Sequence, residues 1–257
     1  MNYTPFLSVI KQLNIQKGDI LLISSDITRL FMLLIEHESI TDPNFIINIL
    51  QEAIGCEGTL LFPTYNWDFC RGTEFNYYKT QSKTGSLSKT ALKRKDFIRT
   101  KHPIYSFAVW GEHQEYLYSL NNTESFGHDS PFNFLYENHG KNLLIDVDYQ
   151  NSFTFLHYVE KSISVVYRYE KNFSAVYTNE LSFSSEKIYS MYVRSLELET
   201  ENNINPIGKI FEENGIAERK TINDIPFIVL DLYSTFDIVK NDIQNNSAKN
   251  IVIYKGQ

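Results

Sequence analysis

The stretch Gly18-Asp19-Ile20-Leu21-Leu22-Ile23-Ser24-Ser25-Asp26 decides the fold. A Gly-Asp turn leads into an apolar run, and the run ends in small polar residues. A short apolar run bounded by turn residues indicates a β-strand. The stretch Gly58-Thr59-Leu60-Leu61-Phe62-Pro63 repeats the pattern, with proline as the stop. We therefore predict strands at 20–23 and 59–62.

Helix and strand signals alternate outward from these two strands. Asp42-Pro43 indicates a helix start, Ile46 and Leu50 keep helical spacing, and Gly55 ends the helix. Such alternation is typical of a layered α/β domain, which we expect to be a single domain over residues 1–257. The other expected elements are a long loop at 64–84, a helix at 87–95, strands at 106–110 and 142–147, a helix from 157, a strand-rich subregion near 165–200, and a helix–strand–helix tail at 207–240.

Composition excludes several classes of protein. A net charge of −7 argues against nucleic-acid binding, which favours basic stripes. The two cysteines, Cys56 and Cys70, fit a reduced compartment, and the N-terminus has no signal-peptide pattern. Apolar runs are too short to span a bilayer. We expect a cytoplasmic protein without nucleic-acid or membrane partners, and the sequence is compatible with a homodimer.

The segment from Asp146 to Glu160 carries the strongest chemical signal. A strand ends in polar residues, and a helix follows with His157 and Glu160 three positions apart, on one helix face. A neutral imidazole is the natural general base near pH 7, and a nearby carboxylate orients it and raises its basicity. The alternative is a buried structural histidine beside a solvated glutamate.

Three further features are candidates for binding or catalysis. Lys93-Arg94-Lys95, Arg99 and Lys101 form a basic cluster that could hold cofactor phosphates, or be a solvated helix face. Ser24-Ser25-Asp26 could offer hydroxyls and N–H groups to a pyrophosphate. His102, held before Pro103, is either an acid/base or ligand contact or a structural turn histidine. Dinucleotide, P-loop and metal motifs are absent, and we expect no metal.

The order of these pieces resembles the aminoglycoside 3-N-acetyltransferase family, which differs in fold from the GNAT acetyltransferases. The resemblance covers nearly the whole chain from residue 18. Beyond the two opening strands, it rests on Thr84-Gly85-Ser86-Leu87, Arg99-Thr100-Lys101-His102-Pro103, Ser106-Phe107-Ala108, Phe126-Gly127, Ser130-Pro131 and the His-x-x-Glu signature at 157–160.

This resemblance implies an α/β/α sandwich with a central mixed sheet, and an enzyme that uses acyl-CoA to acylate an amino-sugar amine. His157 would act as general base and Glu160 would orient it. Ser152 and Thr154 are candidate donors to the developing oxyanion. The residues implied on the coenzyme A side are Ser24, Ser25, Lys93, Arg94, Arg99 and Ser106. The donor is acetyl-CoA or a longer acyl-CoA.

Departures from the family pattern suggest a different acceptor. Asp26 and Asn151 stand where aminoglycoside-modifying members have other residues, and Lys89 replaces a common acidic residue. We expect Asp26, Asn151, Lys89 and Thr154 to line a substrate pocket. The other walls of this pocket would be the aromatic residues of the long loop, which are Tyr65, Trp67, Phe69, Tyr77 and Tyr78. An aromatic, partly basic pocket favours a dTDP- or UDP-linked amino sugar of O-antigen or lipopolysaccharide synthesis. The alternatives are aminoglycoside acetylation, which confers antibiotic resistance, and a non-catalytic carbohydrate- or nucleotide-binding protein.

Overall fold

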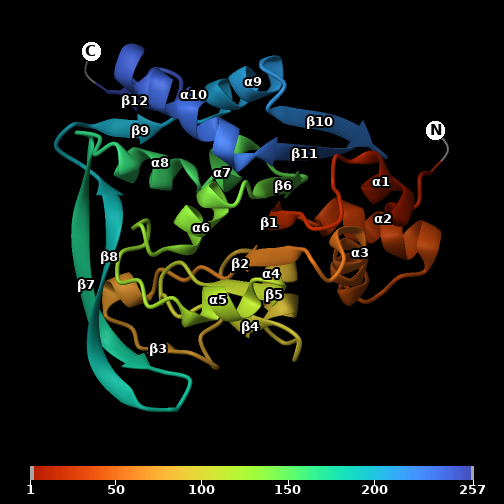
Figure 1. The fold of residues 1–257 in the computed structure, drawn as a ribbon, viewed down its shortest axis with the longest axis horizontal. Helices are drawn as coiled ribbons and strands as arrows, with labels where there is room; N and C mark the ends of the chain where they lie inside the picture. The colour runs from red at the N-terminus through yellow and green to blue at the C-terminus, as the bar shows by residue number, and fades with distance from the viewer. Residues whose placement is uncertain (1–2, 256–257) are drawn as a thin grey trace.

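A seven-stranded mixed sheet forms the centre of the structure (Figure 1). The computed structural model describes residues 3–255, so the ends of the predicted domain 1–257 lie outside the described residues. The strand order is β10-β11-β6-β1-β2-β5-β4. The bounds of these strands are Ile20–Ser25 for β1, Thr59–Pro63 for β2, Ile98–Arg99 for β4, Phe107–Gly111 for β5, Lys141–Ile145 for β6, Ala217–Ile222 for β10 and Ile225–Asp231 for β11.

The two strands that open the sequence pair in parallel. Leu21 lies opposite Leu60, and on the other side of β1, Ser25 lies opposite Ile145 of the parallel strand β6. The outer strands β5, β4, β11 and β10 all join antiparallel. The carboxyl ends of β1, β2 and β6 therefore meet at one edge, where open α/β sheets commonly bind ligands.

Both faces of the sheet are apolar. Side chains alternate between the two faces along each strand, and consecutive residues of the central strands are apolar. Leu21 and Ile23 belong to one buried cluster, while Ile20 and Leu22 belong to another on the opposite face. The first cluster is covered by α1 (Phe6–Gln12), α2 (Thr28–Glu38), α3 (Asn44–Ile54) and α4 (Gly85–Ala91). The second is covered by α5 (Gln114–Ser119), α6 (Pro131–Glu137), α7 (Tyr149–Ser152), α8 (Leu156–Ser162), α9 (Asn205–Glu213) and α10 (Leu232–Asn245). The predicted α/β/α sandwich with a mixed sheet is confirmed.

A long two-stranded ribbon forms the predicted strand-rich subregion. Strands β7 (Arg168–Thr178) and β8 (Ser184–Arg194) pair antiparallel along their whole lengths and run down one side of the molecule (Figure 1). The short strand β3 (Phe75–Asn76) extends this sheet. Strand β9 (Thr200–Asn202) pairs with β12 (Val252–Tyr254) near the end of the chain.

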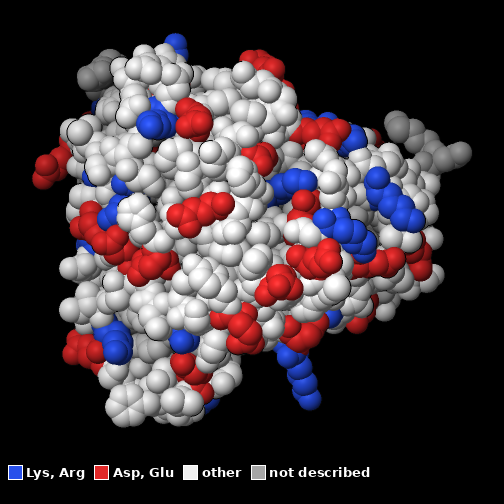
Figure 2. Space-filling view, viewed as in Figure 1, with Lys and Arg blue, Asp and Glu red and all other residues white. Residues whose placement is uncertain are grey.

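Several elements differ from the sequence-based expectation. The elements that were not predicted are helices α1, α2, α5, α6 and α7 and strands β3, β4, β10 and β12. The helix predicted over 87–95 ends at Ala91. After Ala91 the amides of Lys93 and Arg94 donate to carbonyls three residues back, a tighter turn than the α-helix. No helix within residues 3–255 is long and apolar enough to cross a bilayer. On the face drawn in Figure 2, acidic and basic side chains of the described residues are interspersed.

Gly111 should be essential to the pairing of β5 with β2. Its φ is +110°, and a Cβ there would lie 2.0 Å from the carbonyl oxygen of Gly58. Because this neighbour is backbone, we expect Gly111→Ala to cost more than about 3 kcal/mol in free energy of unfolding, measured by urea denaturation. Gly72→Ala is the control: its φ is +81° but its surroundings are open, so about 1 kcal/mol is expected. Equal losses in the two variants would contradict this packing.

Candidate active site

The predicted catalytic helix, α8, follows the carboxyl end of β6 after one short helix, α7. Asp148 accepts a hydrogen bond from the Asn151 amide and so begins α7. After that single turn the chain enters α8, which carries His157 and Glu160. The Ser24 hydroxyl at the end of β1 lies 3.4 Å from the carbonyl oxygen of Ser152, so it holds α7 against the edge of the sheet. Strand order and helix spacing thus bring His157 to the edge where the parallel strands end.

His157 and Glu160 form a buried dyad. Nδ1 of His157 lies 2.7 Å from Oε2 of Glu160. The Glu160 side chain is completely buried, whereas that of His157 is 18% exposed. A hydrogen bond from Nδ1–H to the carboxylate leaves the lone pair on Nε2, which is the arrangement that a general base needs. The spacing-based prediction that these two side chains meet is confirmed by this geometry, and their catalytic roles stay a prediction.

Arg168 is the third member of the cluster and was missed from the sequence. Its Nε lies 2.7 Å from Oε2 of Glu160, the same oxygen that faces His157. The Arg168 side chain is 6% exposed. It begins strand β7, eight positions beyond Glu160, and no helical or strand spacing links the two. The only sequence signal is a cation within the apolar, aromatic run Val165–Tyr169.

The surroundings lower the pKa of His157 below its ordinary value. Burial is the main cause, the Arg168 guanidinium acts in the same direction, and the Glu160 carboxylate opposes both. Burial alone would raise the pKa of Glu160, but His157 and Arg168 together bring it below its usual value. The neutral imidazole and ionised carboxylate are therefore the stable forms near pH 7.

Of the two candidate oxyanion donors, Ser152 has another partner. Its hydroxyl donates to the Asp148 carbonyl within α7. Thr154 is half-buried three residues before His157, and its amide donates to the Ser152 carbonyl. The aromatic ring of Phe126 packs against the His157 imidazole with centroids 5.6 Å apart. Thr154 therefore remains a candidate, and Phe126 limits the imidazole on one side.

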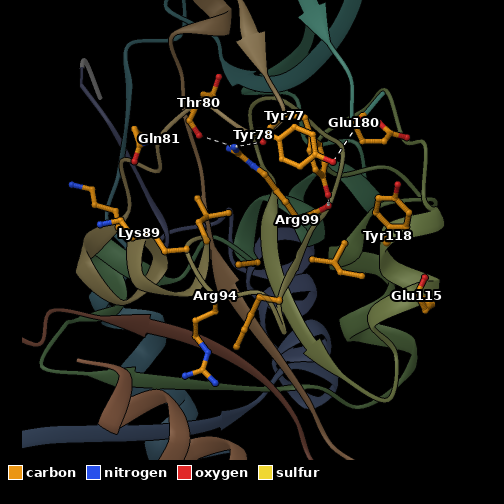
Figure 3. Close-up of a pocket in the computed structure, with 15 residues that line it drawn as sticks. Tyr77, Tyr78, Thr80, Gln81, Lys89, Arg94, Arg99, Glu115, Tyr118 and Glu180 are labelled. Atoms are coloured by element: carbon orange, nitrogen blue, oxygen red, sulfur yellow. Dashed lines mark hydrogen bonds between the residues drawn. The ribbon is translucent and has the colours of Figure 1, made fainter. Parts of the chain in front are cut away.

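A cavity of about 610 Å³ lies beside the edge strand β4, between α4 and α5 (Figure 3). Arg99 points from β4 toward Thr80, and Lys89 of α4 lies on one wall, opposite Tyr118 and Glu115 of α5. Lys93 also lines this cavity. Arg99 is 5% exposed, and burial lowers its pKa to about 10, so it remains a cation at neutral pH.

Two of the predicted cofactor residues are occupied elsewhere. Ser106 is completely buried, and its hydroxyl lies 2.8 Å from Thr64 Oγ1 and accepts from Nε of Arg99. The Arg94 guanidinium donates to Asp96 and to Gln51 of α3, and in Figure 3 it points away from the rest of the cavity. Ser106 thus has no surface for a cofactor, and Arg94 ties α3 to the chain beyond α4.

Only part of the predicted aromatic pocket forms: Tyr77 and Tyr78 line the cavity beside β4, whereas Tyr65, Trp67 and Phe69 do not. Tyr65, Phe69 and Tyr77 are buried in the core, although other residues of the loop, such as Glu74 and Lys79, are exposed. Trp67 packs against the same core, with its indole ring 6.3 Å from that of Tyr105. Tyr78 is 69% exposed and Trp67 is half-buried, so both keep some access to solvent. The buried aromatic side chains are structural anchors, as core aromatics commonly are.

The remaining predicted substrate residues lie at the surface near the sheet edge. Asp26 is exposed and accepts hydrogen bonds from Thr28 at the start of α2. Asn151 is exposed and donates to Asp148. Both side chains support local turns and also face solvent, so their part in substrate binding stays a prediction.

His102 is a structural histidine. It is 1% exposed, and its Nδ1 accepts from the amides of Ile104 and Tyr105 at 3.2 and 3.1 Å. These bonds require an unprotonated Nδ1 and fix the turn at Pro103 that leads into β5. Of the two interpretations of the sequence, the structural turn histidine is the one that this geometry supports.

The sequence matches a known family over most of its length. Residues 36–244 match the family described as aminoglycoside 3-N-acetyltransferase. The chain is 23% identical over 229 residues to the SPbeta prophage-derived aminoglycoside N(3')-acetyltransferase-like protein YokD of Bacillus subtilis (strain 168), covering 80% of this chain and 81% of the relative.

Solved structures show the same fold. The crystal structure of YokD covers 98% of this chain and 97% of its own, with a TM-score of 0.76 and 21% identity. The structure of AAC-VIa with bound sisomicin gives a TM-score of 0.79 at 15% identity, over 95% of this chain and 99% of that one. The binary complex of AAC-IIIb with CoASH gives 0.75 at 15% identity, over 92% and 95%.

The fold and the family match define an N-acyltransferase. The chain belongs to the aminoglycoside 3-N-acetyltransferase family. The interpretation as a nucleotide-sugar acyltransferase of surface polysaccharide synthesis is therefore wrong: these relatives are aminoglycoside acetyltransferases, and the aromatic side chains that suggested a nucleotide are mostly buried. Asp26 and Asn151 are exposed residues that support local turns, and they do not by themselves define a nucleotide pocket.

Burial of His102 should make the protein sensitive to acid. Its folded pKa of about 3 lies below the ordinary 6.5, so between these values the unfolded chain binds a proton that the folded chain does not. The stability that His102 contributes is fully present above about pH 6.5. It is lost as the pH falls, by about 1.4 kcal/mol of unfolding free energy per pH unit. Urea denaturation of His102→Gln between pH 4.5 and 8 should show lower stability throughout but a shallower decline. His157 contributes in the same direction, so some slope remains; an unchanged slope would contradict the assignment.

Proposed function

We propose that this protein transfers an acetyl group from acetyl-CoA to the 3-amino group of an aminoglycoside. The observation that carries this proposal is the His157–Glu160 dyad at the carboxyl edge of the sheet, in a chain that belongs to this family. Among the similar structures, AAC-IIIb is bound to CoASH and AAC-VIa to sisomicin, which supports a thioester donor and an aminoglycoside acceptor.

In the proposed step, the acceptor nitrogen attacks the thioester carbonyl carbon and a C–N bond forms. The proton on that nitrogen passes to Nε2 of His157, whose Nδ1–H stays bonded to Glu160. The C–S bond then breaks, and the departing sulfur takes the proton from Nε2. The products are an amide and a free thiol, and His157 is neutral again. Thr154 is the candidate donor to the transient oxyanion.

For the cofactor, we infer a path from His157 past the end of β1 and along α4. Ser25 lies next to the start of α4, since a Cβ on Gly85 would be 3.3 Å from the Ser25 carbonyl oxygen. One face of α4 then leads to the cavity with Lys89, Lys93 and Arg99, whose positive charges suit the phosphates of coenzyme A. Ser24, Ser25, Lys93 and Arg99 are retained as cofactor residues. Acetyl is the simplest donor; the acyl length stays a prediction.

The acceptor would approach from the exposed side of His157, near Asp26, Asn151 and Thr154. Carboxylates are the expected partners of a polycationic aminoglycoside, which makes Asp26 the strongest of these candidates. A cytoplasmic location fits both an acyl-CoA donor and the two free cysteines. A homodimer stays a prediction.

Substitution of His157 tests the function and the base together. We expect purified wild-type protein to release free thiol from acetyl-CoA only with aminoglycosides that carry a 3-amino group, and mass spectrometry to find one added acetyl group there. His157→Asn and His157→Ala should lower kcat about 10²- to 10⁴-fold, because the amine proton has no acceptor.

The control for this experiment is His37→Asn, on the distant helix α2, which should keep wild-type rates. Wild-type rates in both His157 variants would disprove the assignment of the base. Failure of the wild-type protein to acetylate any 3-amino aminoglycoside would disprove the acceptor class.

Two neighbouring lysines test the cofactor path. Lys93 and Lys95 are both exposed, but only Lys93 lines the cavity. We expect Lys93→Ala to raise the KM for acetyl-CoA several-fold with little change in kcat, because a phosphate contact is lost in ground and transition state alike. Lys95→Ala is the matched control and should leave KM unchanged. Equal effects would indicate only a general loss of charge.

A further inference from the structure

We propose that Arg168 is a positioning residue for acyl transfer, which fixes the Glu160 carboxylate against His157 and cancels its negative charge. This inference rests on the proposed function for its kinetic meaning, but the side-chain arrangement that carries it does not depend on the identity of the acceptor. It assigns a role in the site to the ribbon β7–β8, which otherwise lies outside the sandwich.

The geometry places one carboxylate oxygen between two nitrogens. Oε2 of Glu160 lies 2.7 Å from Nδ1 of His157 and 2.7 Å from Nε of Arg168. Glu160 is completely buried, and burial of an ionised carboxylate is costly unless a cation is nearby. A neutral imidazole can donate a hydrogen bond but supplies no charge. Arg168 is therefore the group that allows Glu160 to remain ionised beside a neutral His157.

The guanidinium is itself held in place. One terminal nitrogen donates to Oδ1 of Asn202 at 2.9 Å, on β9, and the other to the carbonyl oxygen of Tyr192 at 3.4 Å, on β8. Three strands thus fix Arg168, and Arg168 in turn fixes Glu160. A site of this kind needs such support because small displacements of a base reduce the rate strongly.

The charges of the cluster decide the state of His157. With a neutral imidazole, Glu160 and Arg168 sum to zero; a protonated imidazole leaves one net positive charge in a largely buried site. The other ionisable groups that act on Glu160 are the phenols of Tyr167 and Tyr192, which are neutral near pH 7. Lys161 of α8 pairs with Glu170 and Glu124. Arg168 therefore opposes protonation of His157, and Glu160 favours it.

The two charges should move the titration of His157 in opposite directions. Glu160→Gln should shift its midpoint to lower pH. Arg168→Met should shift it to higher pH by about half to one unit, since an opposing charge is removed from a buried site. Arg168→Lys keeps the charge, so the midpoint of His157 should stay close to that of wild type. Its kcat should fall, because the guanidinium's hydrogen bonds to Asn202 and Tyr192 are lost.

Arg168→Met leaves Glu160 without a cation and can fail to fold, so the decisive comparison uses two variants that both lack the buried carboxylate. The double variant Glu160→Gln/Arg168→Met removes both charges and is expected to fold. It differs from Glu160→Gln only at Arg168, so its His157 midpoint should lie at higher pH than that of Glu160→Gln. Equal midpoints in these two proteins would overturn the proposal.

The midpoint is measured in two ways. NMR titration of the six histidines, with His157 assigned through His157→Asn, needs no acceptor. The acid limb of kcat/KM for acetyl transfer gives the same quantity in the working enzyme. Shifts seen by NMR without any aminoglycoside turnover would sustain the role of Arg168 in the cluster and refute the proposed acceptor. Aminoglycoside turnover with unshifted His157 midpoints would refute the role of Arg168 and sustain the proposed acceptor.

Discussion

Glu160 is completely buried, and the arrangement of the active site follows from this one carboxylate. An ionised group at that depth needs both a cation and hydrogen-bond donors, or the helix that carries it would not pack. Arg168 supplies the charge and His157 the second contact. Because Arg168 begins β7, the pair joins α8 of the sandwich to the β7–β8 ribbon. Catalytic geometry and attachment of the ribbon thus rest on the same interaction.

The site combines segments that are far apart in the chain. The proposed base, His157, comes from α8, the residues beside it from the ends of β1 and β6, and the basic cavity from α4 and β4. Parallel pairing of β1 with β2 and β6 brings these strand ends to one edge. Helices α3 and α4 cover one face and α6, α8 and α10 the other, so the edge is left open to ligands.

The electrostatics of the dyad differ from a simple carboxylate–imidazole pair. A lone carboxylate would raise the pKa of the imidazole and make it a stronger base that is more often protonated. Burial and Arg168 act in the opposite direction. His157 is consequently a weaker base, and its neutral form, which is the form that can accept a proton, is favoured near neutral pH.

The sequence by itself determined part of the secondary structure and the contact within the dyad. Apolar runs ending in Ser or Pro predicted β1 and β2, and the spacing of His157 and Glu160 predicted their contact, because strand and helix periodicities are local properties. Helix α2 was missed since its apolar run is short and its end, Ser39, is an uncommon left-handed residue. Only the tertiary structure decided that Arg168 completes the cluster, that Ser106 is enclosed and that Tyr65 is core. Those outcomes depend on which segments pack together, and burial and long-range ion pairs leave no periodic trace in the chain.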